Sequence, residues 1–180
     1  MHIPYKIVNF PLSKSLNPRL LERVNQNITL DASYSTSGLS GRRTDFEFHQ
    51  KDIKEINILT TWIMNILPEV SIIFASKSSE EDTYHYNPHN FKLVNLWGVK
   101  YDKKDVLVEH NHFPAVLSFV YGVKTPKGSG PLFIENKKIQ LKEGECIFFL
   151  ASTYHEVKYN NCDDRCVIAG NLIYTVDKLR

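Results

Sequence analysis

The second half of the chain alternates between short apolar runs and turn-forming residues, and this alternation constrains the fold more than any other feature. From Phe91 onward, turn signals lie at residues 102–104, 125–130, 135–137 and 143–144. The runs between them predict strands at residues 91–101, 105–112, 115–123, 131–134, 138–142, 145–150, 153–159 and 165–175. Eight strands this short fit two facing sheets, so we expect a jelly roll that is mainly β.

The first half of the chain predicts helices that flank this β core. Residues 3–12 suggest a strand at a sheet edge, and a helix follows, with Ser15 or Asn17 as its cap and Pro18 in its first turn. Residues 51–67 carry apolar residues at helical spacing and are followed by Pro68, which predicts the end of that helix. Residues 70–75 then read as a buried strand.

The length of 180 residues suits one domain with a full core. We therefore expect a single domain over residues 1–180. Residues 1–90 supply its N-terminal helices, edge strands and loops, and residues 91–176 form its jelly-roll core.

Three histidines carry the strongest chemical signal. His110 and His112 stand two apart in a strand-like run, so both side chains point to the same face. His155 lies in a later strand candidate. Three imidazoles that converge predict a metal site, but they suit iron, zinc, copper and nickel alike.

Arg165 follows His155 by ten residues and suggests an anion-binding partner for that site. If residues 160–164 form the loop of a hairpin, Tyr159 faces Arg165 and His155 faces Ala169. The guanidinium is then rooted roughly 13 Å along the strand from the His155 level, which leaves room for a short dicarboxylate between metal and arginine. A loop one residue longer or shorter would turn Arg165 to the opposite face of the strand.

These residues stand in a wider pattern. It comprises Trp97, His110-x-His112, residues 117–121, 130–133 and 143–149, His155 and Arg165. Over residues 97–174 the pattern resembles the iron(II)- and 2-oxoglutarate-dependent oxygenases, in particular small oxygenases of phage and marine bacterial type. The resemblance implies a double-stranded β-helix (jelly-roll) core with N-terminal flanking α-helices.

The resemblance also implies an enzyme, a dioxygenase that uses Fe(II), 2-oxoglutarate and O₂. Such an enzyme hydroxylates a peptide or protein side chain or a small molecule while 2-oxoglutarate is decarboxylated to succinate. His110, His112 and His155 would be the metal ligands, and Arg165 would hold the far carboxylate of 2-oxoglutarate. Ser118 or Tyr121 would add a hydroxyl contact to this co-substrate.

The sequence departs from the family pattern at His112, where the broad superfamily has Asp or Glu. A neutral ligand there should weaken the hold on a bare cation. Glu109 is a poor replacement, because as the neighbour of His110 in a strand it points to the opposite face. Either His112 is the third ligand, or His110 and His155 hold the metal together with water.

Candidate substrate contacts lie outside the histidine motif. Trp97 precedes it and is expected to line the cleft or to be a core aromatic. Arg42 and Arg43 lie in the loop of residues 29–50, where they contact an acidic or peptide substrate or form part of a solvated loop. His85 and His89, in the loop of residues 76–90, are expected at the surface or on the substrate side.

Composition limits the remaining possibilities. A net charge of +2 is too small to indicate a nucleic-acid-binding protein. No apolar run approaches twenty residues, the first residues lack the pattern of a signal peptide, and three cysteines fit a reducing compartment, so we expect a cytoplasmic protein without a membrane partner.

Two alternatives remain open. A cupin shares the jelly roll and the His-x-His start, but Val116 and Leu117 stand where a cupin glutamate would follow, and Lys104 replaces a typical glycine. The other alternative is a catalytically inactive jelly-roll protein with a binding or structural role. Turnover of 2-oxoglutarate separates both from the oxygenase.

Overall fold

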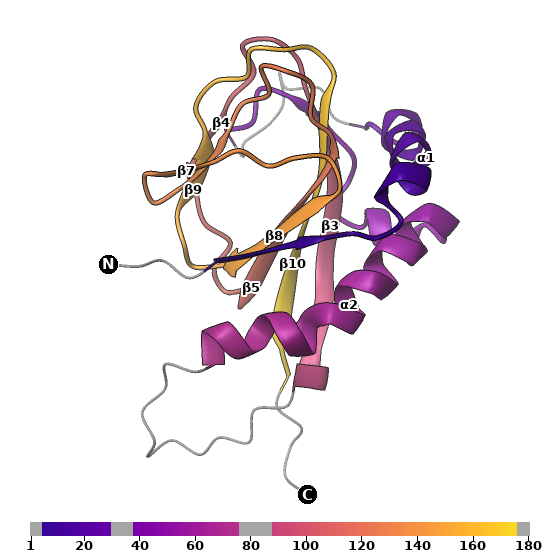
Figure 1. Ribbon diagram of the computed structural model, residues 1–180, viewed down its shortest axis with the longest axis vertical. Coiled ribbons are helices and arrows are strands. Elements are labelled where there is room, and N and C mark those ends of the chain that lie inside the picture. The colour runs from indigo at the N-terminus through magenta and orange to yellow at the C-terminus, as the bar shows by residue number, and fades with distance from the viewer. Residues whose placement is uncertain (1–4, 30–37, 76–87, 176–180) are drawn as a thin grey trace, which may run out of the picture.

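The computed structural model describes residues 5–29, 38–75 and 88–175, in which two facing β-sheets are flanked by helices (Figure 1). The helical elements are α1 (Ser13–Gln26), α2 (Lys54–Ala75) and the short 3₁₀ turns η2 (Phe48–Gln50) and η3 (Pro88–Asn90). The strands are β1 (Tyr5–Asn9), β2 (Arg42–Arg43), β3 (Phe91–Tyr101), β4 (Leu107–His110), β5 (Leu117–Lys124), β6 (Leu132–Ile134), β7 (Lys137–Ile139), β8 (Glu145–Leu150), β9 (His155–Val157) and β10 (Arg165–Tyr174).

The expected jelly roll is confirmed by the order of these strands. Six form one sheet in the order β1-β8-β5-β10-β3-β2, and four form the other in the order β4-β9-β6-β7. Every strand pair is antiparallel. The strand expected in residues 3–12 is β1, and it lies at a sheet edge as predicted.

The six-stranded sheet has two faces with different roles, which follow from the alternation of side chains along β10. Cys166 and Ile168 point toward the helices and join a core with Leu20 and Val24 of α1 and with residues of α2. Arg165, Val167, Ala169 and Asn171 point the other way and line a cavity that faces the four-stranded sheet. One face therefore stabilises the fold, and the other builds the site.

The helix α2 corrects two sequence-based expectations. It continues through Pro68 to Ala75, so the helix end at residue 67 and the strand at residues 70–75 were both wrong. The apolar face does not stop at the proline: the buried positions Ile56, Leu59, Ile63, Leu67 and Val70 keep three- and four-residue spacing across it. The free energy gained by burying this apolar stripe offsets the cost of the backbone hydrogen bond that the proline removes.

The helix α1 also differs from the prediction at its start. It begins at Ser13 with Leu12 in the capping position and no side-chain cap, so neither Ser15 nor Asn17 caps it and Pro18 lies inside the helix. Asn17 is instead buried against β5, where its Nδ2 donates to the Val123 carbonyl at 2.9 Å. Its side chain therefore ties the helix to the sheet.

Among the described residues, no helix is both long and apolar enough to cross a membrane.

Candidate metal centre

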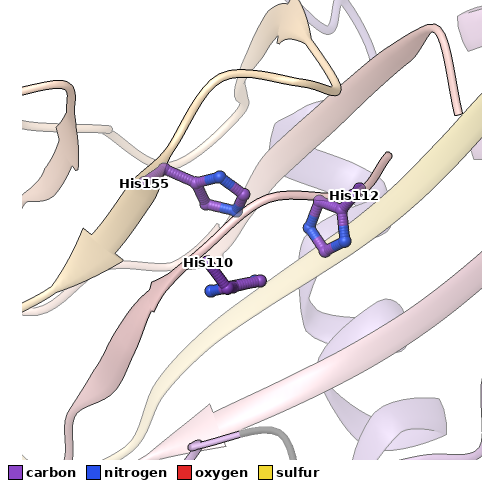
Figure 2. A group of neighbouring side chains, drawn as sticks. All are labelled: His110, His112 and His155. Atoms are coloured by element: carbon purple, nitrogen blue, oxygen red, sulfur yellow. The ribbon is translucent and has the colours of Figure 1, made fainter. Parts of the chain in front are cut away.

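The three histidines predicted as metal ligands lie together at one end of the four-stranded sheet (Figure 2). His110 ends β4, His155 begins β9, and the two residues are paired across these strands. His112 lies just beyond β4, where its backbone N–H donates to the Ala151 carbonyl at 2.7 Å. Nitrogen atoms from all three rings lie within 4.8 Å of one another. The side chains thus converge on a single point, as a metal site requires.

Backbone carbonyls determine which ring nitrogen is available at two of these histidines. Nδ1 of His110 lies 2.8 Å from the Val108 carbonyl, and Nδ1 of His155 lies 3.1 Å from the Thr153 carbonyl. A carbonyl oxygen can only accept, so each Nδ1 carries the proton. Nε2 is then left with its lone pair free, which is the form that ligates metals.

Burial keeps two of the rings neutral. Removal from water, together with the neighbouring histidines, lowers the pKa of His112 to about 4 and that of His155 to about 3. Edge-on contacts with Trp97 (5.6 Å between ring centres) and Phe149 (4.9 Å) surround His112 and His155 with aromatic rings. At neutral pH both imidazoles are therefore unprotonated and ready to bind a cation.

A cavity of about 260 Å³ lies between the two sheets, and the histidines form part of its wall. The six-stranded sheet contributes alternate residues of β3 and β10, and the four-stranded sheet contributes apolar side chains such as Leu132 and Val157. The described residues that line it include no aspartate and no glutamate. Glu109 is exposed beside the cluster, in line with the expectation that it faces away from the metal site.

Arg165 lies in this cavity although the geometric argument that placed it there was wrong. His155 and Arg165 are not in one hairpin: β9 pairs with β4 and β6, whereas β10 pairs with β3 and β5. The segment between them carries the chain from one sheet to the other. Because the sheets face each other, His155 and Arg165 still point into the same space.

The guanidinium of Arg165 is positioned for a ligand. The side chain is only 2% exposed and stacks on Tyr101, with the guanidinium carbon 4.4 Å from the ring centre. Its Nη1 is buried and has no hydrogen-bond partner among the described residues. A buried charged donor without a partner is costly, so this atom is suited to bind an anion.

Ion pairs fix the start of β10 just before Arg165. Asp164, which has a positive φ of 65°, pairs with Lys100 of β3 and Lys124 of β5. The two lysines lie on the strands that flank β10, so Asp164 joins all three strands. These ion pairs fix the position of Arg165 along β10 relative to the two neighbouring strands.

The remaining predicted site residues divide into those that line the cavity and those that do not. Trp97, Ser118 and Arg43 line it. Ser118 lies at the level of Asn171, to which its hydroxyl donates at 2.8 Å, and this level is roughly 20 Å from Arg165 along β10. Ser118 therefore cannot share a carboxylate with Arg165.

Two predicted contacts are corrected by the structure. Tyr121 faces the helices, is fully buried, and donates its hydroxyl to Asn17 Oδ1 at 2.5 Å. Ser118 and Tyr121 are three residues apart on one strand, so they point to opposite faces. Arg42 is outside the cavity lining, and its guanidinium pairs with Asp102 at 2.8 Å.

The structure describes only part of the two loops that were predicted to contact substrate. Residues 30–37 and 76–87, and with them His85, lie outside the described residues. His89 is exposed and does not line the cavity.

Sequence reasoning missed the polar residues Tyr101, Asn95 and Asn171, which also line the cavity. Tyr101 and Asn95 share the parity of Trp97 on the strand expected at residues 91–101. Alternation from Trp97, a candidate cleft residue, was therefore an unused signal for both of them.

Comparisons with known proteins identify the fold. No protein-family model matches the sequence, and no curated protein matches it. Solved structures do match. The viral collagen prolyl hydroxylase of Paramecium bursaria Chlorella virus-1, in complex with 2-oxoglutarate, aligns over 93% of this chain and 94% of its own, at 12% identity and a TM-score of 0.68.

Two further structures have the same architecture. A prolyl hydroxylase of Trichoplax adhaerens, bound to a peptide of the hypoxia-inducible factor, aligns over 93% of this chain and 82% of its own, at 14% identity and a TM-score of 0.61. The epimerase SnoN of nogalamycin biosynthesis, in complex with Fe³⁺, α-ketoglutarate and nogalamycin RO, aligns over 96% and 79%, at 12% identity and a TM-score of 0.69. The chain therefore has the jelly-roll fold of the 2-oxoglutarate- and iron-dependent oxygenases.

Proposed function

We propose that the protein is an Fe(II)- and 2-oxoglutarate-dependent dioxygenase that hydroxylates a peptide or protein side chain or a small molecule. One observation carries this proposal. In a single cavity, a cluster of three histidines on one sheet faces a buried arginine on the other, and one donor of this arginine has no partner among the described residues. A metal ion and a dicarboxylate are the ligands that satisfy both groups at once.

The donor set fits a metal ion, with His110, His112 and His155 as ligands. Three imidazoles do not select iron among the first-row metals. The choice of iron is supported by the shared fold, since SnoN was solved with Fe³⁺ and α-ketoglutarate. His112 is proposed as the third ligand rather than as a neighbour of the metal, because its ring nitrogen lies within 4.8 Å of ring nitrogens of both His110 and His155.

The co-substrate has a corresponding place. The guanidinium of Arg165 would bind the far carboxylate of 2-oxoglutarate, because its planar donors match the two carboxylate oxygens and its Nη1 has no hydrogen-bond partner within the described part of the chain. The guanidinium packs against the face of the Tyr101 ring. Burial raises the pKa of the Tyr101 hydroxyl, which keeps it protonated and uncharged beside the bound carboxylate.

The chain's own contribution to the reaction is binding, orientation and exclusion of water. Bound iron, 2-oxoglutarate and O₂ would together supply the oxidant, with one oxygen atom ending in succinate, the other in the hydroxylated product, and CO₂ released. The walls formed by residues such as Val99, Val167, Leu132 and Phe149 keep the reacting groups away from bulk water. Trp97, beside His112, is proposed to line the path of the primary substrate.

The proposal is tested by anaerobic titration of the Fe(II)-loaded protein with 2-oxoglutarate, followed by calorimetry and by visible charge-transfer absorption. Wild type is expected to bind 2-oxoglutarate only when the metal is present. Arg165→Gln is expected to bind it at least about tenfold more weakly, since a charge-assisted pair is lost. Arg42→Gln, which removes a positive charge outside the cavity, is the matched control. Equal affinities in all three proteins would refute the assignment of Arg165.

The all-histidine cluster favours a second candidate, a metal-binding jelly-roll protein that does not turn over 2-oxoglutarate. A carboxylate is the usual third ligand in the resembled family, and none lies in this cluster among the described residues. Metal binding without any binding of 2-oxoglutarate would support this candidate.

A further inference from the structure

The cavity carries a second cation that the proposed co-substrate does not use. Arg43 lines the same space as Arg165, and no described acidic residue lines it. We propose that Arg43 is the anion receptor for the primary substrate, and that this substrate carries a carboxylate which the guanidinium binds side-on. The proposal deepens the function proposed above and rests on it for the site of reaction.

The register of the sheet places Arg43 in the cavity. Arg43 belongs to β2, the edge strand of the six-stranded sheet, and is paired with Val99 of β3. Directly opposed residues of antiparallel strands point to the same face, and Val99 lines the cavity. Arg42 alternates to the other side and pairs with Asp102. Two adjacent arginines thus have different roles, and only Arg43 faces the site.

Among the described residues, Arg43 donates one side-chain hydrogen bond and keeps a buried donor unpaired. Nη1 donates to the neighbouring Thr44 carbonyl at 3.1 Å. Nε is buried and has no partner among the described residues. The nearest acid in sequence, Asp45, pairs through Oδ2 with Lys51 at 2.6 Å, and its buried Oδ1 has no hydrogen-bond partner among the described residues, so Asp45 acts on Arg43 through its charge alone. Nε and Nη2 form one edge of the planar guanidinium, and this edge matches the two oxygens of a carboxylate.

A series of aromatic contacts leads from the Arg43 guanidinium to the metal cluster. The guanidinium carbon of Arg43 lies 4.0 Å from the centre of the Phe46 ring. Phe46 contacts Trp97 edge-on, with 5.0 Å between ring centres, and Trp97 contacts His112 at 5.6 Å. These contacts form a continuous path along the cavity wall from the guanidinium of Arg43 on one sheet to the histidine cluster of the facing sheet, and we propose that the substrate spans this path between an anchored carboxylate and the metal.

The balance of charge in the cavity lining also favours an anion besides 2-oxoglutarate. Three neutral imidazoles do not reduce the charge of a divalent metal, and the dianion of 2-oxoglutarate only matches it. Both guanidinium groups then remain in excess in a cavity whose described lining has no carboxylate. Burial already lowers the pKa of Arg43, with Asp45 and Glu47 opposing the effect. An anionic substrate offsets the free-energy cost of burying the guanidinium charge, and a neutral substrate does not.

The proposal is tested with probes that differ only in the charge of one group. One set consists of N-acetyl amino acids and their amides, and the other of capped peptides that contain either Glu or Gln. The first set represents free acids and the second represents protein side chains. Binding is measured by calorimetry on the full chain, loaded anaerobically with Fe(II) and 2-oxoglutarate and also metal-free. A Trp62→Phe background leaves Trp97 as the sole tryptophan and so as a local fluorescence reporter.

In wild type, carboxylate probes are expected to bind at least about tenfold more tightly than the matching amides. Arg43→Gln should abolish this preference, Arg43→Lys should retain part of it, and the control Arg42→Gln should retain all of it. The probe set that shows the preference identifies the source of the carboxylate.

Two results would overturn the proposal: equal binding of acids and amides by wild type, or a preference that survives in Arg43→Gln. A third would reassign the residue, namely loss of 2-oxoglutarate binding in Arg43→Gln but not in Arg165→Gln. If 2-oxoglutarate never binds but acids show Arg43-dependent binding, the proposed function fails and the anion receptor stands.

Discussion

His155 and Arg165 are ten residues apart in the chain, lie on different sheets, and point into the same cavity. The histidine begins β9 in the four-stranded sheet, and the arginine begins β10 in the six-stranded sheet. The segment between them crosses from one sheet to the other. The site therefore depends on how the two sheets face each other and not on a single hairpin.

Replacement of His112 tests its role as a ligand. His112→Ala should weaken Fe(II) binding at least about tenfold, because one of three donors is lost. His112→Asp should bind Fe(II) at least as tightly as wild type, because an anionic oxygen replaces a neutral nitrogen. Anaerobic Fe(II) titration measures both, with Glu109→Ala as the control on the opposite face. Unchanged affinity in His112→Ala would show that His112 is not a ligand.

The metal-free protein should lose stability as the pH falls from about 6.5 to about 3. The folded chain holds the pKa of His112 near 4 and that of His155 near 3, whereas the unfolded chain takes up protons near the ordinary value of 6.5. In this window the unfolded state binds more protons than the folded state, so acid favours unfolding. Below about pH 3 both states hold the same number of protons on these histidines, and their effect on the unfolding free energy stays constant.

Urea unfolding of the metal-free protein at several pH values measures this effect. Wild type should show a steeper loss of unfolding free energy between pH 6.5 and 4 than His155→Gln, in which one of the buried titrating groups is removed. Parallel curves for the two proteins would contradict the prediction.

Tyr121→Phe separates a core residue from a co-substrate contact. The change removes the hydroxyl that donates to Asn17 Oδ1 and leaves that oxygen buried without the bond. We expect a loss of about 1–2 kcal/mol in unfolding free energy and no change in affinity for 2-oxoglutarate. Urea denaturation and calorimetry measure the two quantities. Weaker 2-oxoglutarate binding at unchanged stability would place the hydroxyl in the site after all.

Gly98→Ala tests how closely α1 packs on β3. A Cβ atom at this position would approach Cγ2 and Cγ1 of Val24 to 2.6 and 2.8 Å. We expect a destabilisation of about 1–3 kcal/mol from this crowding. In a Val24→Ala background the same change should cost much less, so the two substitutions should be strongly non-additive in urea unfolding. Additive effects would contradict the contact.

The features that the sequence predicted well are local ones. The strands expected at residues 91–101 and 145–150 have the bounds of β3 and β8, since alternation and flanking turns specify a strand without reference to the rest of the fold. The convergence of His110 and His112 was expected from alternation within a strand of residues 105–112, but β4 ends at His110, and His112 lies beyond it with its backbone bonded to Ala151. His155 was added as a histidine in a later strand candidate, and its pairing with His110 is a contact that only the structure shows.

The failures depend on contacts between distant segments. Pro68 was taken as a helix end because the prediction weighed the lost hydrogen bond and not the buried stripe that continues to Val70. The 155–165 hairpin was assumed because neighbours in sequence usually pair, and only the assembled sheets show that the chain crosses between them. Arg42 and Arg43 could not be told apart until the pairing of β2 with β3 fixed their parity.

The most direct measurement of the central claim is succinate formation from 2-oxoglutarate in air, with Fe(II) and a panel of candidate carboxylate substrates. Wild type and Arg42→Gln should form succinate in an iron-dependent manner, Arg165→Gln should require far more 2-oxoglutarate, and His155→Ala should form none. A wild-type protein that binds Fe(II) but does not consume 2-oxoglutarate with any of the substrates would contradict the account and favour a metal-binding jelly roll without oxygenase activity.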